Sequence, residues 1–180
     1  TTNATENISF TNAMRLNVAA PYNNSQFYRS TAATTTENKS RMWLDLVPPT
    51  GAAVRTLLGY ADGATNNTDR TYDAITQPTS DILIYTLLNV TDQQEYLIQG
   101  RALPFDVTDK VKLGVKTTAS GLHKIALSKT DGIFDNTTGS GQTIYLEDKD
   151  LNIIHNLTLA PYQFNSAIGV FNSRFEIRYN

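Results

Sequence analysis

The sequence predicts an all-β protein, an antiparallel β-sandwich that is jelly-roll-like and has about ten strands. Apolar and polar residues alternate over most of the readable segments, which is the period-two pattern of strands with one buried face. Turn residues separate these segments at intervals of roughly 8–15 residues. No segment longer than about eight residues keeps the 3.6-residue period of an amphipathic helix, so helix is a minor component.

The N-terminal region predicts one strand followed by a polar loop. The alternating apolar residues of this strand are Ile8, Phe10, Met14, Leu16 and Val18. Residues 19–38 are rich in Thr, Asn and Ser, a composition typical of a surface loop. We therefore expect one domain over residues 1–180, with residues 1–38 supplying a linker and the first strand.

The next segments predict a pair of strands and a buried central strand. Residues 41–46 place Met42, Leu44 and Leu46 on one face, and Pro48-Pro49 ends the strand because proline cannot donate to a ladder. Residues 54–60 predict its partner. The apolar run 82–88 is typical of a central strand that is buried on both faces.

The C-terminal half predicts the remaining strands. Val111, Leu113 and Val115 alternate with lysines, which indicates a half-exposed strand. Residues 149–152 predict a tight turn that joins strands 144–148 and 153–157 into a hairpin. The further expected strands are 95–99, 123–127, 162–164 and 175–179.

The composition argues against two classes of partner. The net charge is -2 and no basic run occurs, so a nucleic-acid footprint is absent. No window approaches the ~18 consecutive apolar residues of a membrane span. The chain has no cysteine, so it has no disulfide framework. It begins without Met or a signal-peptide pattern, which predicts a mature or excised segment of a longer chain.

Several short motifs occur in a recognisable order. They are RMWLDL at 41–46, LLGY at 57–60, IQGRALPF at 98–105, IYLED at 144–148 and RFEIRY at 174–179. From residue 40 to residue 180 this order resembles the β-sandwich modules of Bacteroidetes surface proteins exported by the type IX secretion system. In those proteins the module typically lies just before the C-terminal sorting signal.

This resemblance implies an extracellular, cell-surface location and a large adhesin or secreted enzyme as the parent protein. It also implies partners in the secretion and outer-membrane anchoring machinery, contacted through a downstream segment. It implies no catalytic residues for this module.

The loop 59–74 admits two interpretations. Asp62, Asp69 and Asp73 carry oxygens of the kind that Ca²⁺ prefers, so a structural calcium site is one of them. Their spacing lacks the glycine and the bidentate glutamate of an EF-hand. In the other interpretation, the acids cap their own turns and the flanking Tyr60 and Tyr72 fix the ends of the loop.

Aromatic side chains suggest a ligand-binding surface. Trp43, Tyr60 and Tyr72 are the candidate ligand-binding residues, because exposed rings stack on sugar faces. Polysaccharide or cell-surface glycans are the corresponding partners. Trp43 alternates away from Met42 and Leu44, and a second layer of the sandwich makes a core position the expected place for it.

Nothing in the sequence points to catalysis. His123 and His155 are the only histidines, and both lie within strand-like alternation with no nucleophile pattern near them. The acidic run 147–150 reads as a solvated turn. We therefore expect a non-enzymatic extracellular module of an adhesin or type IX cargo protein that presents or spaces a binding surface. The alternative is a carbohydrate-binding module of a secreted enzyme.

Overall fold

The computed structural model describes residues 38–76, 80–88 and 94–180. These residues belong to Glu37–Asn180, one of two units into which the chain divides. The strand predicted over residues 8–18 and nearly all of the loop predicted over 19–38 lie outside the described residues. The expectation of a single domain over residues 1–180 stays a prediction.

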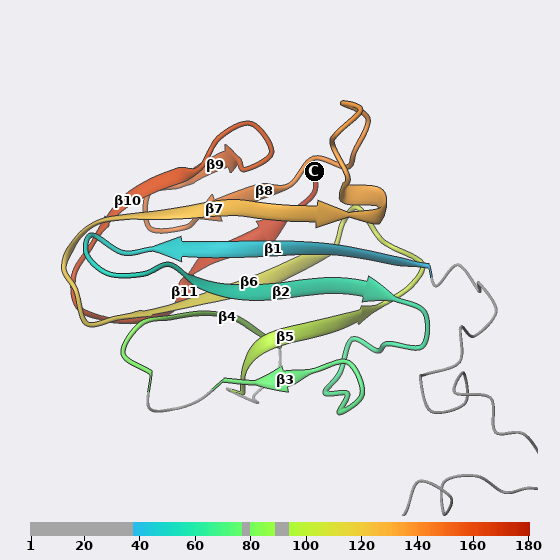
Figure 1. Ribbon diagram of the computed structural model, residues 1–180, viewed down its shortest axis with the longest axis horizontal. Coiled ribbons are helices and arrows are strands. Elements are labelled where there is room, and N and C mark those ends of the chain that lie inside the picture. Colours follow the sequence, from blue (N-terminus) through green and yellow to red (C-terminus); the bar gives the residue numbers. More distant parts are fainter. Residues whose placement is uncertain (1–37, 77–79, 89–93) are drawn as a thin grey trace, which may run out of the picture. The chain divides into compact units, whose positions relative to one another are not determined.

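The described residues form an all-β unit, which confirms the predicted class (Figure 1). The elements are β1 (Lys39–Val47), β2 (Val54–Ala61), β3 (Ala74–Ile75), β4 (Leu83–Leu87), β5 (Glu95–Ala102), β6 (Lys110–Thr117), β7 (Gly121–Asp131), the 3-10 turn η3 (Gly132–Phe134), β8 (Tyr145–Asp148), β9 (Ile153–Asn156), β10 (Tyr162–Ser166) and β11 (Gly169–Arg178). Over these ranges η3 is the only helical element.

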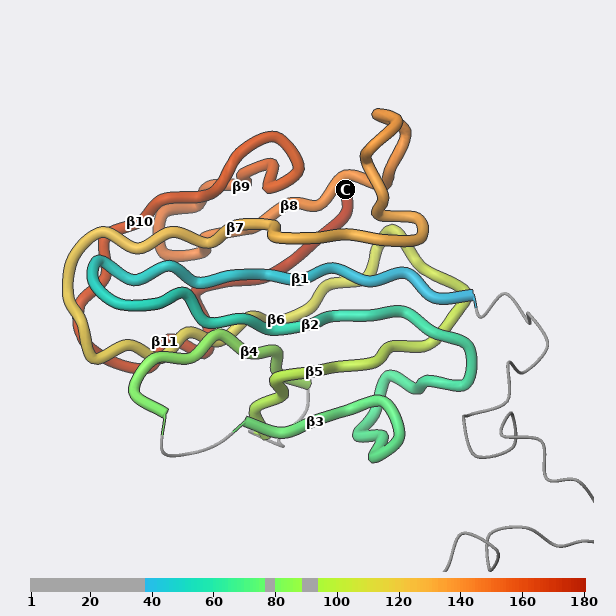
Figure 2. The backbone as a smooth tube through the Cα atoms, viewed as in Figure 1, coloured from blue at the N-terminus to red at the C-terminus, as the bar shows by residue number. Residues whose placement is uncertain are grey.

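The strands are joined into one hydrogen-bonded path that curls towards closure. Its order is β10-β7-β1-β2-β5-β4-β6-β11-β8-β9, and β3 pairs with β5 beside this path. The two ends of the path meet through side chains, because Tyr162 of β10 donates to Asp148 of β8 and its ring packs against His155 of β9. The unit is therefore a nearly closed barrel, and its curvature is visible in the backbone trace (Figure 2).

The prediction of a wholly antiparallel jelly roll is wrong at one strand pair. β2 and β5 are parallel, with Leu57 opposite Ile98 and Gly59 opposite Gly100. A parallel pair needs a long crossover, and the chain between β2 and β5 supplies it together with β3 and β4. Through this ladder the strands belong to one continuous sheet and not to two separate sheets.

The alternation that predicted the strands also defines the core. Met42, Leu44 and Leu46 of β1 are fully buried, as their period-two spacing requires. All five residues of β4 are buried, which confirms that it is a central strand covered on both faces. β8 and β9 form the expected antiparallel hairpin.

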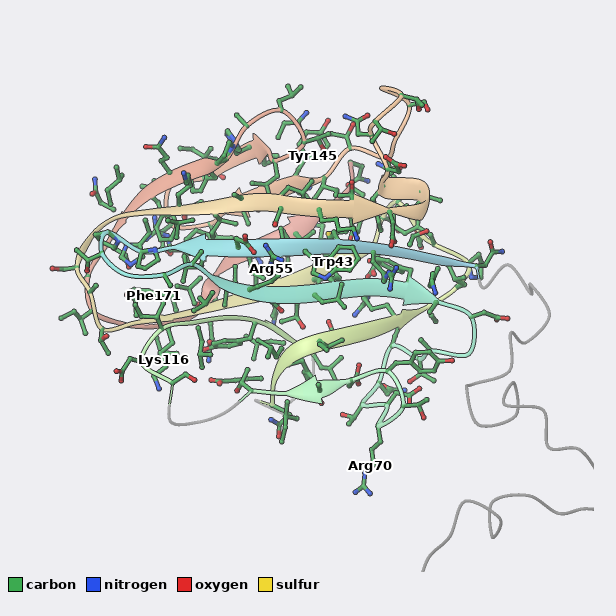
Figure 3. The ribbon with its side chains drawn as sticks, viewed as in Figure 1. Trp43, Arg55, Arg70, Lys116, Tyr145 and Phe171 are labelled. Carbon is green, nitrogen blue, oxygen red and sulfur yellow. The ribbon has the colours of Figure 1, made fainter. Side chains whose placement is uncertain are left out.

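Trp43 is not in the core, contrary to our expectation. It lies on the outward face of β1 and is half-buried (Figure 3). The guanidinium of Arg41 and the ammonium of Lys129 lie 5.1 and 5.0 Å from its ring centroid. The described strands place no second layer over this face, so neighbouring cations cover the ring instead of a packed sheet.

Candidate functional site

One end of the barrel holds a buried ion pair between Arg101, near the end of β5, and Asp109, just before β6. Arg101 donates from Nε to Oδ2 of Asp109 and from Nη2 to Oδ1, both at 2.7 Å. The Tyr60 hydroxyl donates to Oδ2 at 2.7 Å and lies 3.0 Å from the hydroxyl of Tyr179. The backbone N–H of Lys110 donates to Oδ1 at 2.9 Å. Both carboxylate oxygens of Asp109 are therefore fully engaged.

Aromatic rings surround this pair and set its electrostatics. Phe105 packs edge-on against Tyr60 at 5.0 Å and against Tyr179 at 4.9 Å. Burial raises the pKa of the Tyr60 hydroxyl far above its ordinary value, and Tyr179 and the Asp109 carboxylate raise it further. Burial likewise raises the pKa of Tyr179. These hydroxyls stay protonated and act as fixed donors.

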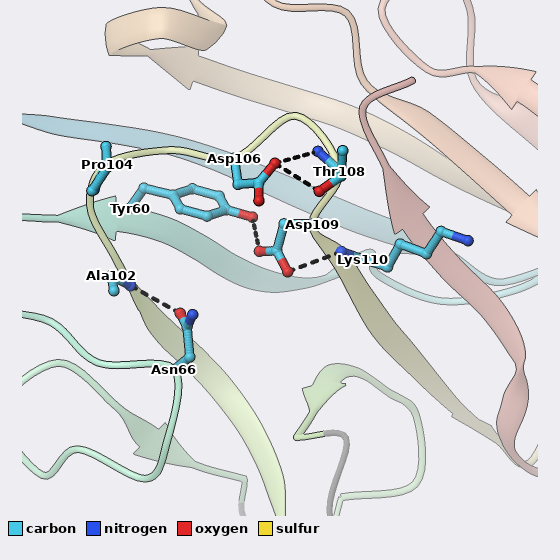
Figure 4. A pocket seen from close by; sticks show the side chains of 8 residues that line it. All are labelled: Tyr60, Asn66, Ala102, Pro104, Asp106, Thr108, Asp109 and Lys110. Carbon is cyan, nitrogen blue, oxygen red and sulfur yellow. Dashed lines mark hydrogen bonds between the residues drawn. The ribbon is translucent and has the colours of Figure 1, made fainter.

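An open recess of about 340 Å³ lies directly beside the pair, and we call it the Asp106 recess (Figure 4). Its lining residues are Tyr60, Asn66, Ala102, Pro104, Asp106, Thr108, Asp109 and Lys110. The Oδ1 atom of Asn66 accepts from the backbone N–H of Ala102 at 3.0 Å, which leaves the Nδ2 donors of Asn66 available.

Asp106 supplies the acceptor of this recess. Its Oδ1 atom accepts from the backbone N–H of Thr108 at 2.8 Å and from the Thr108 hydroxyl at 2.7 Å. These two bonds, the backbone bond first, hold the pKa of Asp106 below its ordinary value. The carboxylate is ionised at neutral pH, and no bond within the described part of the chain occupies its Oδ2 atom.

A second recess of about 500 Å³, here called the Ile133 recess, shares Pro104 with the first. Its lining residues are Asn38, Ser40, Asp62, Leu103, Pro104, Phe105 and Ile133. The walls are held by local bonds, because the Ser40 hydroxyl oxygen accepts from Ile133 N–H at 3.1 Å and the Asn38 carbonyl accepts from Asp62 N–H at 3.2 Å.

The loop 59–74 is internally bonded. Asp73 accepts from the backbone N–H of Asp69 at 2.7 Å and from that of Gly100 at 2.9 Å, so it ties the loop to β5. Asp69 accepts from Thr71 N–H at 2.9 Å in an Asx turn. Among the described residues, no group of three or more His, Asp or Glu side chains is placed to hold a metal ion. The Ca²⁺ site at Asp62, Asp69 and Asp73 stays a prediction.

The structure does not bring Trp43, Tyr60 and Tyr72 together. Tyr60 points inward and is 1% exposed, whereas Trp43 faces outward in the middle of β1. The hydroxyl of Tyr72 donates to the Asp62 carbonyl at 2.8 Å, and its ring lies against Gly100, where a Cβ atom would come within 2.5 Å of the Tyr72 Cβ. Both Gly100 and Gly59 therefore lie on the outward face with Trp43 and Tyr72.

A second buried ion pair lies where the two ends of the strand path meet, at Asp148. Arg174 donates to Asp148 from Nη2 at 2.7 Å and from Nε at 3.0 Å, and the Tyr162 hydroxyl donates at 2.9 Å. Asp148 is 0% exposed, so the prediction of a solvated turn is wrong at this residue. The reason is its alternation: Leu146 and Asp148 share the inward face, while Glu147 points outward. The guanidinium of Arg174 also lies 5.0 Å from the Phe164 ring.

The two histidines have structural partners. His123 is buried, and its ring nitrogens contact Thr117 at 3.0 Å and the Gly121 carbonyl at 2.9 Å. His155 contacts the Ala160 carbonyl at 2.8 Å. Neither lies beside a serine, threonine and carboxylate arranged for nucleophilic attack among the described bonds.

Sequence reasoning missed Asn66, Asp106 and Asp109 as a group. The usable signal was Arg101, which lies two residues beyond the predicted strand 95–99. The observed strand extends to Ala102 and turns Arg101 inward, where a charge needs a buried partner. Asp109 follows it by eight residues, after the Pro104 turn.

The described part of the chain is therefore an all-β, nearly closed barrel with two open recesses at one end, one lined mainly by polar residues and one by both polar and apolar residues. The chain belongs to the family described as "Domain of unknown function (DUF8693)", whose model matches residues 1–179. No match was found among curated proteins or among solved structures. No helix in the described ranges is long and apolar enough to cross a membrane.

Proposed function

We propose that this chain is a non-enzymatic, extracellular module of a cell-surface adhesin or of a secreted type IX cargo protein. It presents a binding surface, or spaces one from a C-terminal anchor, and a segment beyond residue 180 engages the secretion and outer-membrane machinery. The nearly closed barrel serves as a rigid support for the loops.

The observation that carries the proposal is the contrast between the charged core and the open rim. The buried charges form two separate ion pairs, Arg101 with Asp109 and Arg174 with Asp148, each at 2.7 Å. The exposed polar groups of Asn66 and Asp106 line a recess on loops that rigid strands hold. This arrangement suits recognition of a ligand by fixed donors and acceptors.

The surface role is tested with a reporter. Residues 1–180 with the native downstream segment are fused to a fluorescent protein and expressed in the source cell. The expected result is a reporter that external protease removes from intact cells. A matched fusion that lacks the downstream segment is the control. A full-length fusion that stays protected inside the cell contradicts the proposal.

The second candidate function is that of a carbohydrate-binding module of a secreted enzyme. It is supported by Trp43, whose half-buried ring lies on the outward face with Leu57 and with Ile98, which is 38% exposed. Pull-down on insoluble polysaccharides tests it with the Trp43→Ala variant. Retention that this substitution abolishes favours the module of an enzyme, whereas no retention of the unaltered chain contradicts it.

A further inference from the structure

We infer that the Asp106 recess and the Ile133 recess are two adjacent subsites for a neutral oligosaccharide that crosses Pro104. The inference rests on the proposed function as a binding module and names its site and ligand class. Both recesses lie at the barrel end where β2 and β5 finish and β6 begins, and both include Pro104. Their volumes of about 340 and 500 Å³ fall within or near the range of small-ligand sites.

The first subsite carries one acceptor and one donor in a fixed geometry. Asp106 presents its Oδ2 atom, because its Oδ1 atom accepts from Thr108. Asn66 presents its Nδ2 donors, because its Oδ1 atom accepts from the backbone N–H of Ala102. A ligand with several hydroxyls matches this pair, since one hydroxyl donates to the carboxylate while another accepts from the amide. Ala102 and Pro104 supply apolar surface for the C–H face of a sugar ring.

The same groups disfavour other ligand classes. A carboxylate or sulfate on the ligand would be repelled by the ionised Asp106. An ammonium ligand would pair with Asp106 but would have no acceptor for the Asn66 donors. Asp109 contributes no free lone pair, because Arg101, Tyr60 and Lys110 already occupy it. A neutral, hydroxyl-rich ring is the ligand that can bond both the Asp106 acceptor and the Asn66 donors.

The second subsite is more apolar and suits the next ring of the chain. Leu103, Phe105 and Ile133 form its apolar wall, and Ile133 is 43% exposed. Polar groups at Asn38, Ser40 and Asp62 line the remainder of this recess. An aromatic or aliphatic wall with polar neighbours is the usual surface for the C–H face and the hydroxyls of a sugar ring.

The walls are preorganised, so little conformational entropy is lost on binding. The Asn66 amide is fixed on Ala102, the Asp106 carboxylate is fixed in its own turn, and Phe105 is held by ring contacts with Tyr60 and Phe134. A ligand therefore meets donors and acceptors that are already in place.

The test uses isothermal titration of the full chain with a defined panel. The probes are cellotriose, mannotriose and xylotriose, together with glucose, mannose and xylose. At least one trisaccharide is expected to bind about tenfold more tightly than its monosaccharide, because it fills both subsites.

Two near-isosteric substitutions probe the first subsite. Asn66→Asp keeps the acceptor for Ala102 but removes the donors, and Asp106→Asn keeps the acceptor for Thr108 but removes the charge. Each is expected to weaken binding of monosaccharide and trisaccharide alike by about tenfold, the effect of one lost hydrogen bond. Thermal unfolding of each variant shows that it is folded.

A further pair separates the second subsite from the surface in general. Ile133→Ala should weaken trisaccharide binding more than monosaccharide binding and reduce the advantage of the trisaccharide to less than about threefold. Arg70→Ala, at the exposed tip of the loop 62–73, is the control and should change neither value (Figure 3).

The outcomes are distinct from those of the reporter experiment. Binding that survives both Asn66→Asp and Asp106→Asn places the glycan elsewhere and overturns the inference, while a surface-exposed reporter still supports the proposed function. No binding of any probe also overturns it. If Asn66→Asp and Asp106→Asn leave the affinities unchanged while Ile133→Ala still weakens trisaccharide binding, the two-subsite arrangement is rejected.

Discussion

The two buried ion pairs of this barrel have the same composition but different surroundings. Each joins an arginine to an aspartate with a tyrosine hydroxyl as a further donor, and each is packed against aromatic rings. The side chain of Asp109 is 18% exposed and lies on an open recess. That of Asp148 is 0% exposed; it is bonded to Arg174 on the paired strand β11 and to Tyr162 on β10, which shares no backbone ladder with β8.

This difference indicates which pair serves structure alone. Where β10 and β8 meet without backbone hydrogen bonds, the Tyr162 hydroxyl donates to Asp148 and Arg174 donates to the Asn165 carbonyl, so the side chains around the Asp148 pair close the barrel. The Asp109 pair also fastens strand ends, but it fixes one wall of the Asp106 recess at the same time. Each buried ion pair thus links strands of the barrel, and the pair that also borders a recess fixes a wall of a candidate site.

The largest effect is expected at the closed pair. Asp148→Asn removes the charge that Arg174 faces and leaves a cation of which the side chain is 10% exposed. Breaking such a pair costs about 3–5 kcal/mol of unfolding free energy, measured by urea denaturation. Asp45→Asn, at the exposed pair with Arg55, is the matched control and should cost less than about 1 kcal/mol. Equal losses in the two variants would contradict a closing role for Asp148.

Alkali is expected to weaken both regions through their tyrosines. The folded-state pKa of Tyr60 lies far above the ordinary value of about 10, and that of Tyr162 is raised to about 12, in both cases first by burial. Their contribution is complete below about pH 10 and is lost as pH rises through the folded-state pKa. Stability should fall by about 1.4 kcal/mol per pH unit for each tyrosine.

Urea denaturation between pH 9 and pH 11.5 measures this slope. Tyr60→Phe and Tyr162→Phe should each remove one tyrosine's share of it. A slope that both variants leave unchanged would show that these hydroxyls ionise freely in the folded chain.

A smaller effect is expected at the open pair. Asp109→Asn should cost about 2 kcal/mol, because water from the recess can solvate Arg101 when the carboxylate is lost. Burial lowers the pKa of Arg101, but the hydrogen bonds to Asp109 and the charge of that carboxylate raise it, so the pKa of Arg101 is raised overall. A loss as large as that of Asp148→Asn would remove the energetic distinction between the two pairs.

The smallest effect is expected at Gln99, a buried residue of β5. Its side chain is 1% exposed, and neither Nε2 nor Oε1 has a hydrogen-bond partner. Gln99→Met should leave the unfolding free energy unchanged or raise it by about 1 kcal/mol, because it removes an unpaired buried amide. A loss above about 1 kcal/mol in the same urea experiment would reveal an unrecognised partner of the amide.

The sequence predicted local structure well because alternation is a local property. The buried faces of β1 and β6 and the hairpin β8–β9 follow from the period of two alone. The parallel β2–β5 ladder does not follow from this period, since the two paired strands are distant in sequence. Asp148 was misread because polar residues next to a turn are usually solvated, and only the pairing of the strands shows that Arg174 reaches it.

The candidate site was predicted only in part. Tyr60 and Asp62 were singled out, and each lines one of the two recesses. Asn66 and Asp106 are oriented towards the recess because the backbone N–H groups of Ala102 and Thr108 each bond one of their oxygens. Such fixation depends on the exact course of two loops, which residue types alone do not specify.

The parallel ladder between β2 and β5 has a consequence for folding kinetics. Leu57 and Ile98 are about 40 residues apart, and the chain must return through β3 and β4 before they can pair. Such non-local contacts raise the contact order and slow folding. We expect this ladder to form after the rate-limiting step, with φ-values near zero for truncations at Leu57 and Ile98. Until then β2 would carry an unpaired edge, the kind of surface through which partly folded chains aggregate.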